Sequence, residues 1–234
     1  MSSGPQPAKR GYDARSRRQR AEQERANTRS RVLAAARARF LADGYAGTKM
    51  LDIASEAGVA IASVYRAGRS KAELIEMLLE QAITGDDPDA SPDQRPTGAA
   101  LGPPHYPLIA AAASDPQKQV RMIADRITDV TERVGPLWTV LRDAAGIDAR
   151  AAATMHTILE LRAAAYEVAV DLLPQQQLRA SRRESVDTLW ALTSPETYLM
   201  LRTIRGWSHR RYRDWLRQTL LVQLLTPTAN AAPE

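Results

Sequence analysis

The most informative residue types and spacing lie in a twenty-residue window that begins at Met50. Residues in this pattern could hold a helix in position to bind nucleic acid. Ala54 is small enough to let two steeply crossed helices meet, and Gly58 tolerates the positive φ of a tight turn. Apolar residues that would face inward and fix the helix pair are Ile53, Val59 and Val64. The second helix of such a pair faces outward and has the size of the DNA major groove. An ordinary helical hairpin with a glycine turn would share this spacing.

The positive charge of the chain is concentrated at its start. Residues 1–39 hold eleven Lys or Arg and three acids, a net charge of +8, so the remainder carries −3 of the total +5. A basic end on a mildly acidic body favours a polyanionic partner at that end. A solvated disordered tail would have the same composition, and charge alone does not separate the two interpretations.

The region around this spacing resembles the tetracycline-repressor (TetR) family of bacterial regulators over residues 26–83. The resemblance lies in four runs, which are 48–54 (TKMLDIA), 57–59 (AGV), 63–66 (SVYR) and 70–74 (SKAEL). A weaker similarity to the C-terminal domain of one TetR branch lies in residues 188–196 (TLWALTSPE) and 206–208 (GWS). The resemblance implies a sequence-specific transcriptional regulator, most simply a homodimeric repressor that binds a double-stranded DNA operator and is released by a small-molecule effector.

The same resemblance assigns DNA-contacting roles by position. Thr48 and Tyr65 would contact phosphates from the two ends of the unit, and Lys71 would contact the backbone from the start of the fourth helix. The residues that would face the groove are Ile61, Ala62, Ser63 and Arg66. Lys71 also has independent physical support. A lysine in a first turn opposes the helix dipole, but beside free N–H groups it completes an anion site.

The expected recognition helix is poor in hydrogen-bonding side chains. The side chains on it or beside it that can hydrogen-bond to base edges are Ser63, Arg66, Lys49 and Arg69. Ile61 and Ala62 can make only apolar contacts, for example with thymine methyl groups. Phosphate contacts are therefore expected to carry much of the affinity, and the N-terminal arginines could add to them in a minor groove.

Several positions depart from the family pattern. Gly68 stands where an aromatic residue is usual, Ala67 where a His is frequent, Ala60 where Ser or Thr is usual, and Leu51 at a usually polar position. A glycine at 68 can end the helix in a left-handed conformation and removes a ring that would pack on the fourth helix. We therefore expect a loose junction there, and Gly68→Phe would raise the melting temperature. These departures also leave open a ligand- or protein-binding helical module that has lost operator binding.

Helix signals place these motifs on an all-α chain of nine or ten helices. Residues expected to cap or start helices are Thr48, Ser70, Asp115, Ser181, Ser194 and Ser208, and residues 148–173 are expected to form one long helix. Gly44 is expected to end the first helix, and Gly135-Pro136 to break or kink a later one. The expected segments are a basic disordered arm (1–25) that could be helical near its end, a helix-turn-helix domain with a linking helix (26–83, the motif itself at about 49–68), a proline-rich loop (84–107), a C-terminal helical domain for regulation and dimerisation (108–226) and a tail (227–234).

The C-terminal domain offers candidates for a ligand pocket and for a dimer interface. Large side chains that could converge on a cavity are Trp138, Met155, Tyr166, Trp190 and Tyr198. Apolar residues on two late helices that could face a second copy are Val186, Leu189, Trp215, Leu216 and Leu220. Plain core packing is the alternative for both sets.

Composition and missing motifs argue against other classes. The chain has no cysteine, which removes disulfides, thiolate metal sites and cysteine nucleophiles. Its three histidines (His105, His156 and His209) are far apart in sequence, so no metal site and no cofactor is expected. We find no glycine-rich phosphate loop and no nucleophile elbow, which disfavours an enzyme. No apolar run is long enough for a membrane span and no signal peptide is recognisable, so a cytoplasmic protein without a membrane partner is expected.

Overall fold

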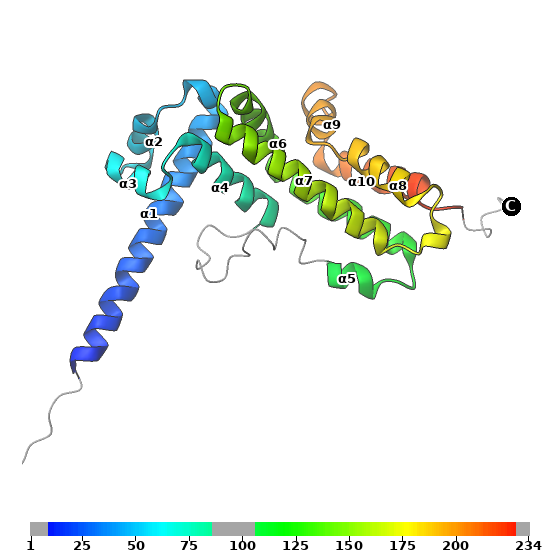
Figure 1. Ribbon diagram of the computed structural model, residues 1–234, viewed down its shortest axis with the longest axis horizontal. Coiled ribbons are helices and arrows are strands. Elements are labelled where there is room, and N and C mark those ends of the chain that lie inside the picture. The colour runs from blue at the N-terminus through cyan, green and yellow to red at the C-terminus, as the bar shows by residue number, and fades with distance from the viewer. Residues whose placement is uncertain (1–8, 86–105, 228–234) are drawn as a thin grey trace, which may run out of the picture.

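The computed structural model describes residues 9–85 and 106–227, with side chains for 16–85 and 108–227, and every regular element in these ranges is helical (Figure 1). The α-helices are α1 (Lys9–Gly47), α2 (Met50–Ala57), α3 (Ile61–Ala67), α4 (Lys71–Thr84), α5 (Tyr106–Ala111), α6 (Pro116–Ala145), α7 (Ala149–Asp171), α8 (Arg182–Leu192), α9 (Pro195–Leu199) and α10 (His209–Leu224). A 3-10 turn (Gln175–Gln177) precedes α8, and a π-helical turn (Met200–Ile204) follows α9. The expected all-α class is confirmed.

The helix-turn-helix unit has its own densely packed core. Apolar side chains recur at three- and four-residue steps on each helix, so each helix buries one face against the others. The large side chains at the centre of this core are Val32, Phe40, Ile53, Val64, Leu74 and Leu79. In Figure 1 α2 and α3 lie beside the second half of α1, and α4 joins them to the rest of the chain. This packing fixes the direction in which α3 faces.

Gly44 interrupts α1 as the sequence predicts. Its φ is 70° and its ψ is 173°, a conformation that a residue with a Cβ rarely adopts. The helical hydrogen bonds resume for one turn after it, where Tyr45 is buried and stacks on Phe40 with 5.8 Å between ring centroids.

The expected disordered arm is helical from Lys9 onward, so that part of the prediction is wrong. Residues 16–25 continue α1 away from the body as an exposed helix (Figure 1). The prediction of disorder rests on the absence of apolar periodicity in this segment. It is nevertheless rich in Arg, Gln, Glu and Ala, which have high intrinsic helix propensity. Residues 1–8 of the expected arm lie outside the described residues.

The start of α2 differs from the prediction that Thr48 caps it. Lys49 is the N-cap residue, and its backbone N–H donates to the carboxylate of Asp52 at 3.3 Å. Thr48 is buried, and its hydroxyl donates to the Gly44 carbonyl at 2.7 Å. The threonine therefore closes the turn at the end of α1 instead of opening α2.

The body of the chain is built on α6 and α7, which run side by side in Figure 1. The expected break at Gly135-Pro136 is absent, because α6 continues unbroken through Pro136. Gly135 is buried where an added Cβ would lie 3.4 Å from Tyr198 and Leu199, so packing of α9 stabilises the helix across the proline. The other expected N-caps (Ser70, Asp115, Ser181, Ser194 and Ser208) all begin helices.

Two hydrophobic clusters divide the body. The first joins the helix-turn-helix core to the C-terminal half of α6, through residues such as Leu137, Trp138 and Leu141. The second lies at the other end, where α8 and α10 bury Leu189, Tyr212 and Leu216 against α6 and α7. The expected loop 84–107 and tail 227–234 fall almost wholly outside the described residues. None of the described helices is both long and apolar enough to cross a membrane.

Candidate nucleic-acid interface and cavity

Helix α3 presents one face to solvent and only Val64 to the core. Ile61 and Tyr65 keep 37% and 50% of their surface exposed, and Ala62 and Arg66 are also exposed on this face. Ser63 is half-buried. Exposed Ile and Tyr side chains have no packing reason to face water on so short a helix, so this face is a candidate contact surface. The structure therefore brings together the five residues of α3 that the sequence singled out.

The guanidinium of Arg66 is folded back onto its own helix. Its Nη2 donates to the Ser63 hydroxyl at 2.8 Å, and its Nε donates to the Ala62 carbonyl at 3.2 Å. A base edge or a phosphate would replace these exposed contacts at little cost, because both partners can turn to water.

The turn between α2 and α3 is held by an arginine that sequence analysis did not single out. Gly58 has a φ of 61° and a ψ of 41°, the left-handed conformation expected of it. The Nη2 of Arg31 donates to the carbonyls of Ala57 at 2.5 Å and Gly58 at 3.0 Å. A cation at the C-terminal end of α2 satisfies carbonyls that have no partner within the helix. The helical spacing of Arg31 in α1 carries no signal for this contact, because it joins residues 26 positions apart.

A groove runs between α3 and the N-terminal part of α1, whose exposed helical segment 16–25 is called the extended part of α1 below. Its volume is about 620 Å³, and it is lined by Ala21, Glu24, Arg25, Thr28, Arg29, Ser63, Arg66 and Ala67. Three arginines and one acid give this groove a positive balance that suits phosphate. It also makes the start of α1 continuous with the exposed face of α3.

Lys71 is placed differently from the other expected contacts. Its ammonium donates to the Tyr45 carbonyl at 2.5 Å and lies 4.4 Å from the centroid of the Tyr45 ring. Burial lowers the pKa of Lys71, while the charge of Asp148 opposes part of that shift. Thr48 is buried and Lys49 is exposed. Lys49 is therefore accessible, whereas Thr48 is buried and the half-buried Lys71 is hydrogen-bonded to the Tyr45 carbonyl.

The junction at Gly68 contradicts the expectation of a loose, underpacked contact. Gly68 is buried with a φ of −155°, so it is extended and not left-handed. A Cβ at this position would lie 2.6 Å from Cδ2 of Leu74 and 3.0 Å from Cε of Met77. Side chains of α4 fill the volume that a ring at position 68 would occupy, and this explains why the glycine is tolerated.

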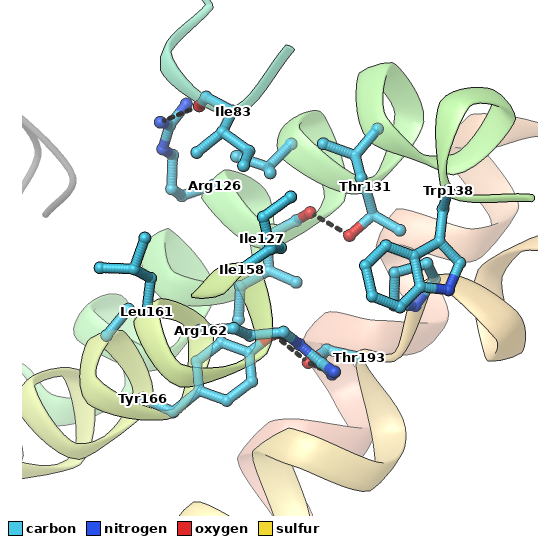
Figure 2. Close-up of a pocket in the computed structure, with 14 residues that line it drawn as sticks. Ile83, Arg126, Ile127, Thr131, Trp138, Ile158, Leu161, Arg162, Tyr166 and Thr193 are labelled. Atoms are coloured by element: carbon cyan, nitrogen blue, oxygen red, sulfur yellow. Dashed lines mark hydrogen bonds between the residues drawn. The ribbon is translucent and has the colours of Figure 1, made fainter. Parts of the chain in front are cut away.

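A cavity of about 140 Å³ lies where α4, α6, α7 and the end of α8 meet (Figure 2). Of the five expected pocket residues, Trp138 and Tyr166 line it. Met155 packs against the first core, Tyr198 is buried beside Tyr212, and Trp190 lies behind the cavity wall. Sequence analysis missed most of the wall, because small aliphatic side chains such as Ile127 and Ile158 look like ordinary core.

The end of α4 is fastened to α6 beside this cavity. Arg133 donates from Nε to the Ala82 carbonyl at 2.8 Å, and Arg126 donates from Nη2 to the Ile83 carbonyl at 2.9 Å. Both carbonyls belong to the last turn of α4, where cations are favourable. Ile83 and Arg126 also line the cavity, so the wall of the cavity and the anchor of α4 share residues.

Three of the five expected dimer residues point inward, which corrects that prediction. Leu189, Leu216 and Leu220 have no exposed surface and form the second core of their own chain. Their helical spacing marked an apolar face correctly, but that face is covered within the chain, where α10 packs on α6 and α8 packs on α7 and α10. Val186 and Trp215 are half-buried and remain available at the surface of α8 and α10.

The described residues contain no cluster of three or more His, Asp or Glu side chains that could hold a metal ion. His156 lies 3.1 Å from Glu160 on an exposed face of α7. His209 lies near carboxylates of α6, with Glu132 at 3.2 Å and Asp129 at 3.9 Å.

The family comparison decides what kind of helix-turn-helix this is. Residues 32–78 match the family model of the bacterial regulatory proteins of the tetR family. The chain carries the TetR-family DNA-binding domain. The matched range spans the second half of α1 through most of α4, which is the unit whose core holds α3 outward. No curated protein matches the chain.

Solved structures extend the likeness beyond the matched range. The chain is similar to NalD of Pseudomonas aeruginosa, the secondary repressor of the MexAB-OprM multidrug efflux pump, with 19% identity and a TM-score of 0.63 over 86% of this chain and 97% of that one. A putative regulator of Saccharomonospora viridis in complex with choline shares 15% identity, with a TM-score of 0.58 over 85% and 98% of the two chains. A TerR/AcrR-family regulator of Aquifex aeolicus shares 14% identity, with a TM-score of 0.55 over 83% and 98%. The chain thus has the fold of these regulators along most of its length.

Proposed function

We propose that the protein is a homodimeric transcriptional repressor that reads a DNA operator with α3 and releases it when a small molecule occupies the cavity. The observation that carries the proposal is the exposed face of α3, where Ile61, Tyr65 and Arg66 face solvent while Val64 anchors the helix in a rigid core. A helix held in this way fits the width of the major groove.

The α3 side chains divide the work of binding. Arg66, with Ser63 as its partner, is suited to a base edge, and Ile61 and Ala62 to thymine methyl groups. The hydroxyl of Tyr65 and the ammonium of Lys49 are suited to phosphates on either side. We assign Thr48 and Lys71 a supporting role, because one is buried and the other donates to the Tyr45 carbonyl.

The extended part of α1 would add phosphate contacts. An α-helix is about 10–12 Å wide with its side chains, whereas the minor groove is about 6 Å wide. Residues 16–25 are helical, so as a helix they do not fit the minor groove that a disordered arm could enter. We place them along the phosphate backbone, next to the arginine-lined groove that they form with α3.

Release by a ligand would act through α4. This helix begins beside α3 and ends at the cavity, where Arg126 and Arg133 of α6 hold its last carbonyls. A ligand that favours a wider gap between α4 and α6 would shift the population of orientations of the helix-turn-helix. Two reading units must lie about 34–36 Å apart, or a multiple of this, to bind adjacent half-sites, so a small rotation is enough to lose the operator. That a structure of the same fold carries choline supports binding of a small molecule.

Fluorescence anisotropy with DNA fragments from beside the protein's own gene tests the proposal. We expect the wild type to bind one fragment at least about a thousandfold more tightly than random duplex at physiological salt. A Tyr65→Ala, Arg66→Ala double variant should lose at least about tenfold affinity for that fragment. Arg210→Ala is the matched control, since Arg210 is an exposed arginine of α10, far along the chain from α3.

Equal, weak binding of every duplex by both the wild type and the double variant would contradict operator binding. It would favour the alternative of a helical ligand- or protein-binding module.

A further inference from the structure

The cavity wall combines an apolar surface with positive charge and lacks acidic side chains. Most of the lining is aliphatic, from residues such as Ile127, Val130 and Ile158. The two charged residues in the wall are Arg126 and Arg162, and neither Asp nor Glu lines the cavity. In the view of Figure 2, the two guanidinium groups lie at opposite ends with the aliphatic side chains between them. An apolar site with a few fixed polar groups is typical of a small-molecule pocket, and the sign of its charge selects the ligand.

Arg162 is held rigidly by neutral partners. Its Nε donates to the Tyr166 hydroxyl at 3.0 Å, and its Nη2 donates to the Trp190 carbonyl at 2.6 Å. The guanidinium carbon lies 4.3 Å from the ring centroid of Trp190 and 5.1 Å from that of Tyr166. The hydroxyl groups of Tyr166 and Thr193 are 2.6 Å apart and hydrogen-bonded, which fixes the tyrosine in turn. The cation is thus oriented before any ligand arrives.

These partners satisfy N–H groups of Arg162 but do not neutralise its charge. No carboxylate of the described residues lies within 4.0 Å of its guanidinium, and no described residue accepts a hydrogen bond from its Nη1. Glu196 is the nearby acid. Burial raises the pKa of Glu196, but the hydrogen bonds from Trp138, its own backbone N–H and Ser194, together with the charge of Arg162, outweigh it and lower the pKa. The Glu196 carboxylate is bound by the Trp138 indole at 2.5 Å, outside the cavity lining.

We propose that the cavity takes a small carboxylate with an apolar body about the size of one aromatic ring, and that Arg162 binds its carboxylate. This inference rests on the proposed function, because it names the class of effector for the same cavity. Nη1 of Arg162 has no acceptor among the described residues, and Nη2 makes only a long second contact, with the Thr193 hydroxyl at 3.5 Å. These two nitrogens match a carboxylate in a two-pronged, charge-assisted hydrogen bond. The size follows from the volume, since an apolar cavity of about 150 Å³ engineered in another protein holds one benzene molecule.

Isothermal titration calorimetry on the full chain, without DNA, tests this assignment with three probes of equal size. The probes are benzoate, its neutral isostere benzamide and the cation benzylamine. We expect the dissociation constant of benzoate to be at least about tenfold lower than that of benzamide, with benzylamine weakest. Arg162→Met should abolish the preference for benzoate while leaving the benzamide affinity within about twofold.

Two further variants keep the test decisive. Arg142→Met removes an exposed arginine of α6 outside the cavity lining and should leave all three affinities unchanged. Arg162→Lys keeps the charge but not the planar fork, so it should retain only part of the benzoate preference, and it carries the test if Arg162→Met does not fold. Benzylamine binding as tightly as benzoate, a benzoate preference that survives in both Arg162 variants, or no benzoate binding at all would overturn the proposal.

The outcome is separable from that of the proposed function. Selective benzoate binding by a protein that binds no operator would support the cavity assignment and reject the repressor. Operator binding by a protein that shows no selectivity for benzoate would do the reverse.

Discussion

The phenolic oxygen of Tyr45 lies 2.6 Å from Oδ2 of Asp148, and this hydrogen bond joins residues 103 positions apart in the chain. Tyr45 closes the end of α1, and Asp148 caps the start of α7 by accepting from the N–H groups of Arg150 and Ala151. The backbone carbonyl of the same tyrosine accepts a hydrogen bond from the ammonium of Lys71. The first turns of α4 and α7 and the last turn of α1 therefore meet at one residue, Tyr45, between the DNA-binding unit and the body.

Removing this hydrogen bond should lower stability in a pH-dependent way. Tyr45→Phe should cost about 1–2 kcal/mol of unfolding free energy at neutral pH. The hydrogen bond from Tyr45 is the main reason that the pKa of Asp148 is lowered. The contribution of this hydrogen bond to the unfolding free energy is therefore fully present above the unfolded pKa of about 3.9. It is lost as the pH falls through the lower, folded value. Urea unfolding of the wild type and of Tyr45→Phe should therefore differ at about pH 7, and the difference should shrink as the pH falls through the folded pKa of Asp148.

Tyr65→Phe serves as the control for this comparison, since the Tyr65 side chain is half-exposed on α3. It should leave unfolding unchanged at every pH. A difference between Tyr45→Phe and wild type that stays constant down to about pH 2 would show that packing of the ring, and not the bond to Asp148, carries the effect.

A side chain at position 68 should destabilise the protein. The volume next to Gly68 is filled by Leu74 and Met77, so Gly68→Ala forces these side chains to shift and should cost about 1–3 kcal/mol. Gly68→Phe should cost more, and both should lower the melting temperature measured by circular dichroism. The matched control is Gly47→Ala, because a Cβ there meets only Asp43 at an ordinary 3.5 Å. A higher melting temperature for Gly68→Phe would show that the junction has room after all.

The contrast at position 68 illustrates what sequence could and could not provide. The spacing of Ala54, Gly58 and Val64 predicted the helix-turn-helix correctly, because each requirement is local and steric. Whether a missing ring leaves a hole depends on how Leu74 packs, and that is a tertiary question. The same limit explains Leu189, Leu216 and Leu220, whose apolar periodicity was right but whose partners are helices of the same chain rather than a second copy.

Arginine contacts with distant backbone carbonyls were beyond sequence analysis for a related reason. Arg31, Arg126 and Arg133 each bind the last carbonyls of a helix far away in the chain. Nothing in the spacing of a charged residue on an amphipathic helix separates this role from simple exposure. Arg162 was missed in the same way, because its neighbours come from segments that only the fold brings together.

The exposed arginines in the extended part of α1 should affect how DNA binding depends on salt. Arg18, Arg20 and Arg25 are exposed on this helix. If they neutralise phosphates, replacing all three by Gln should lower operator affinity and reduce the slope of log affinity against log salt by about 0.9 for each phosphate that is no longer neutralised. Fluorescence anisotropy at several salt concentrations measures both quantities. An unchanged slope would reject a role for this segment.

A helix-breaking variant separates the charge of this segment from its rigidity. Ala21→Pro keeps every arginine but interrupts α1 at an interior position. If the helix aligns the arginines along the DNA backbone, this variant should lose affinity although its charge is unchanged. If the variant binds as the wild type does, the segment acts only as a charged tether.

The surviving candidates for the dimer interface predict a dimer that one exposed residue can disrupt. Val222 is 55% exposed on α10, the helix that also carries the half-buried Trp215. The wild type should sediment as a dimer at micromolar concentration, and Val222→Asp should sediment as a monomer, because an unpaired carboxylate in an interface is costly to desolvate. The monomer should also lose operator affinity, since one reading unit contacts only one half-site.

Val168→Asp is the matched control, because Val168 is 41% exposed on α7 and its replacement should leave the dimer intact. A dimer that survives Val222→Asp would move the interface away from α10, and a wild type that sediments as a monomer would reject the dimer.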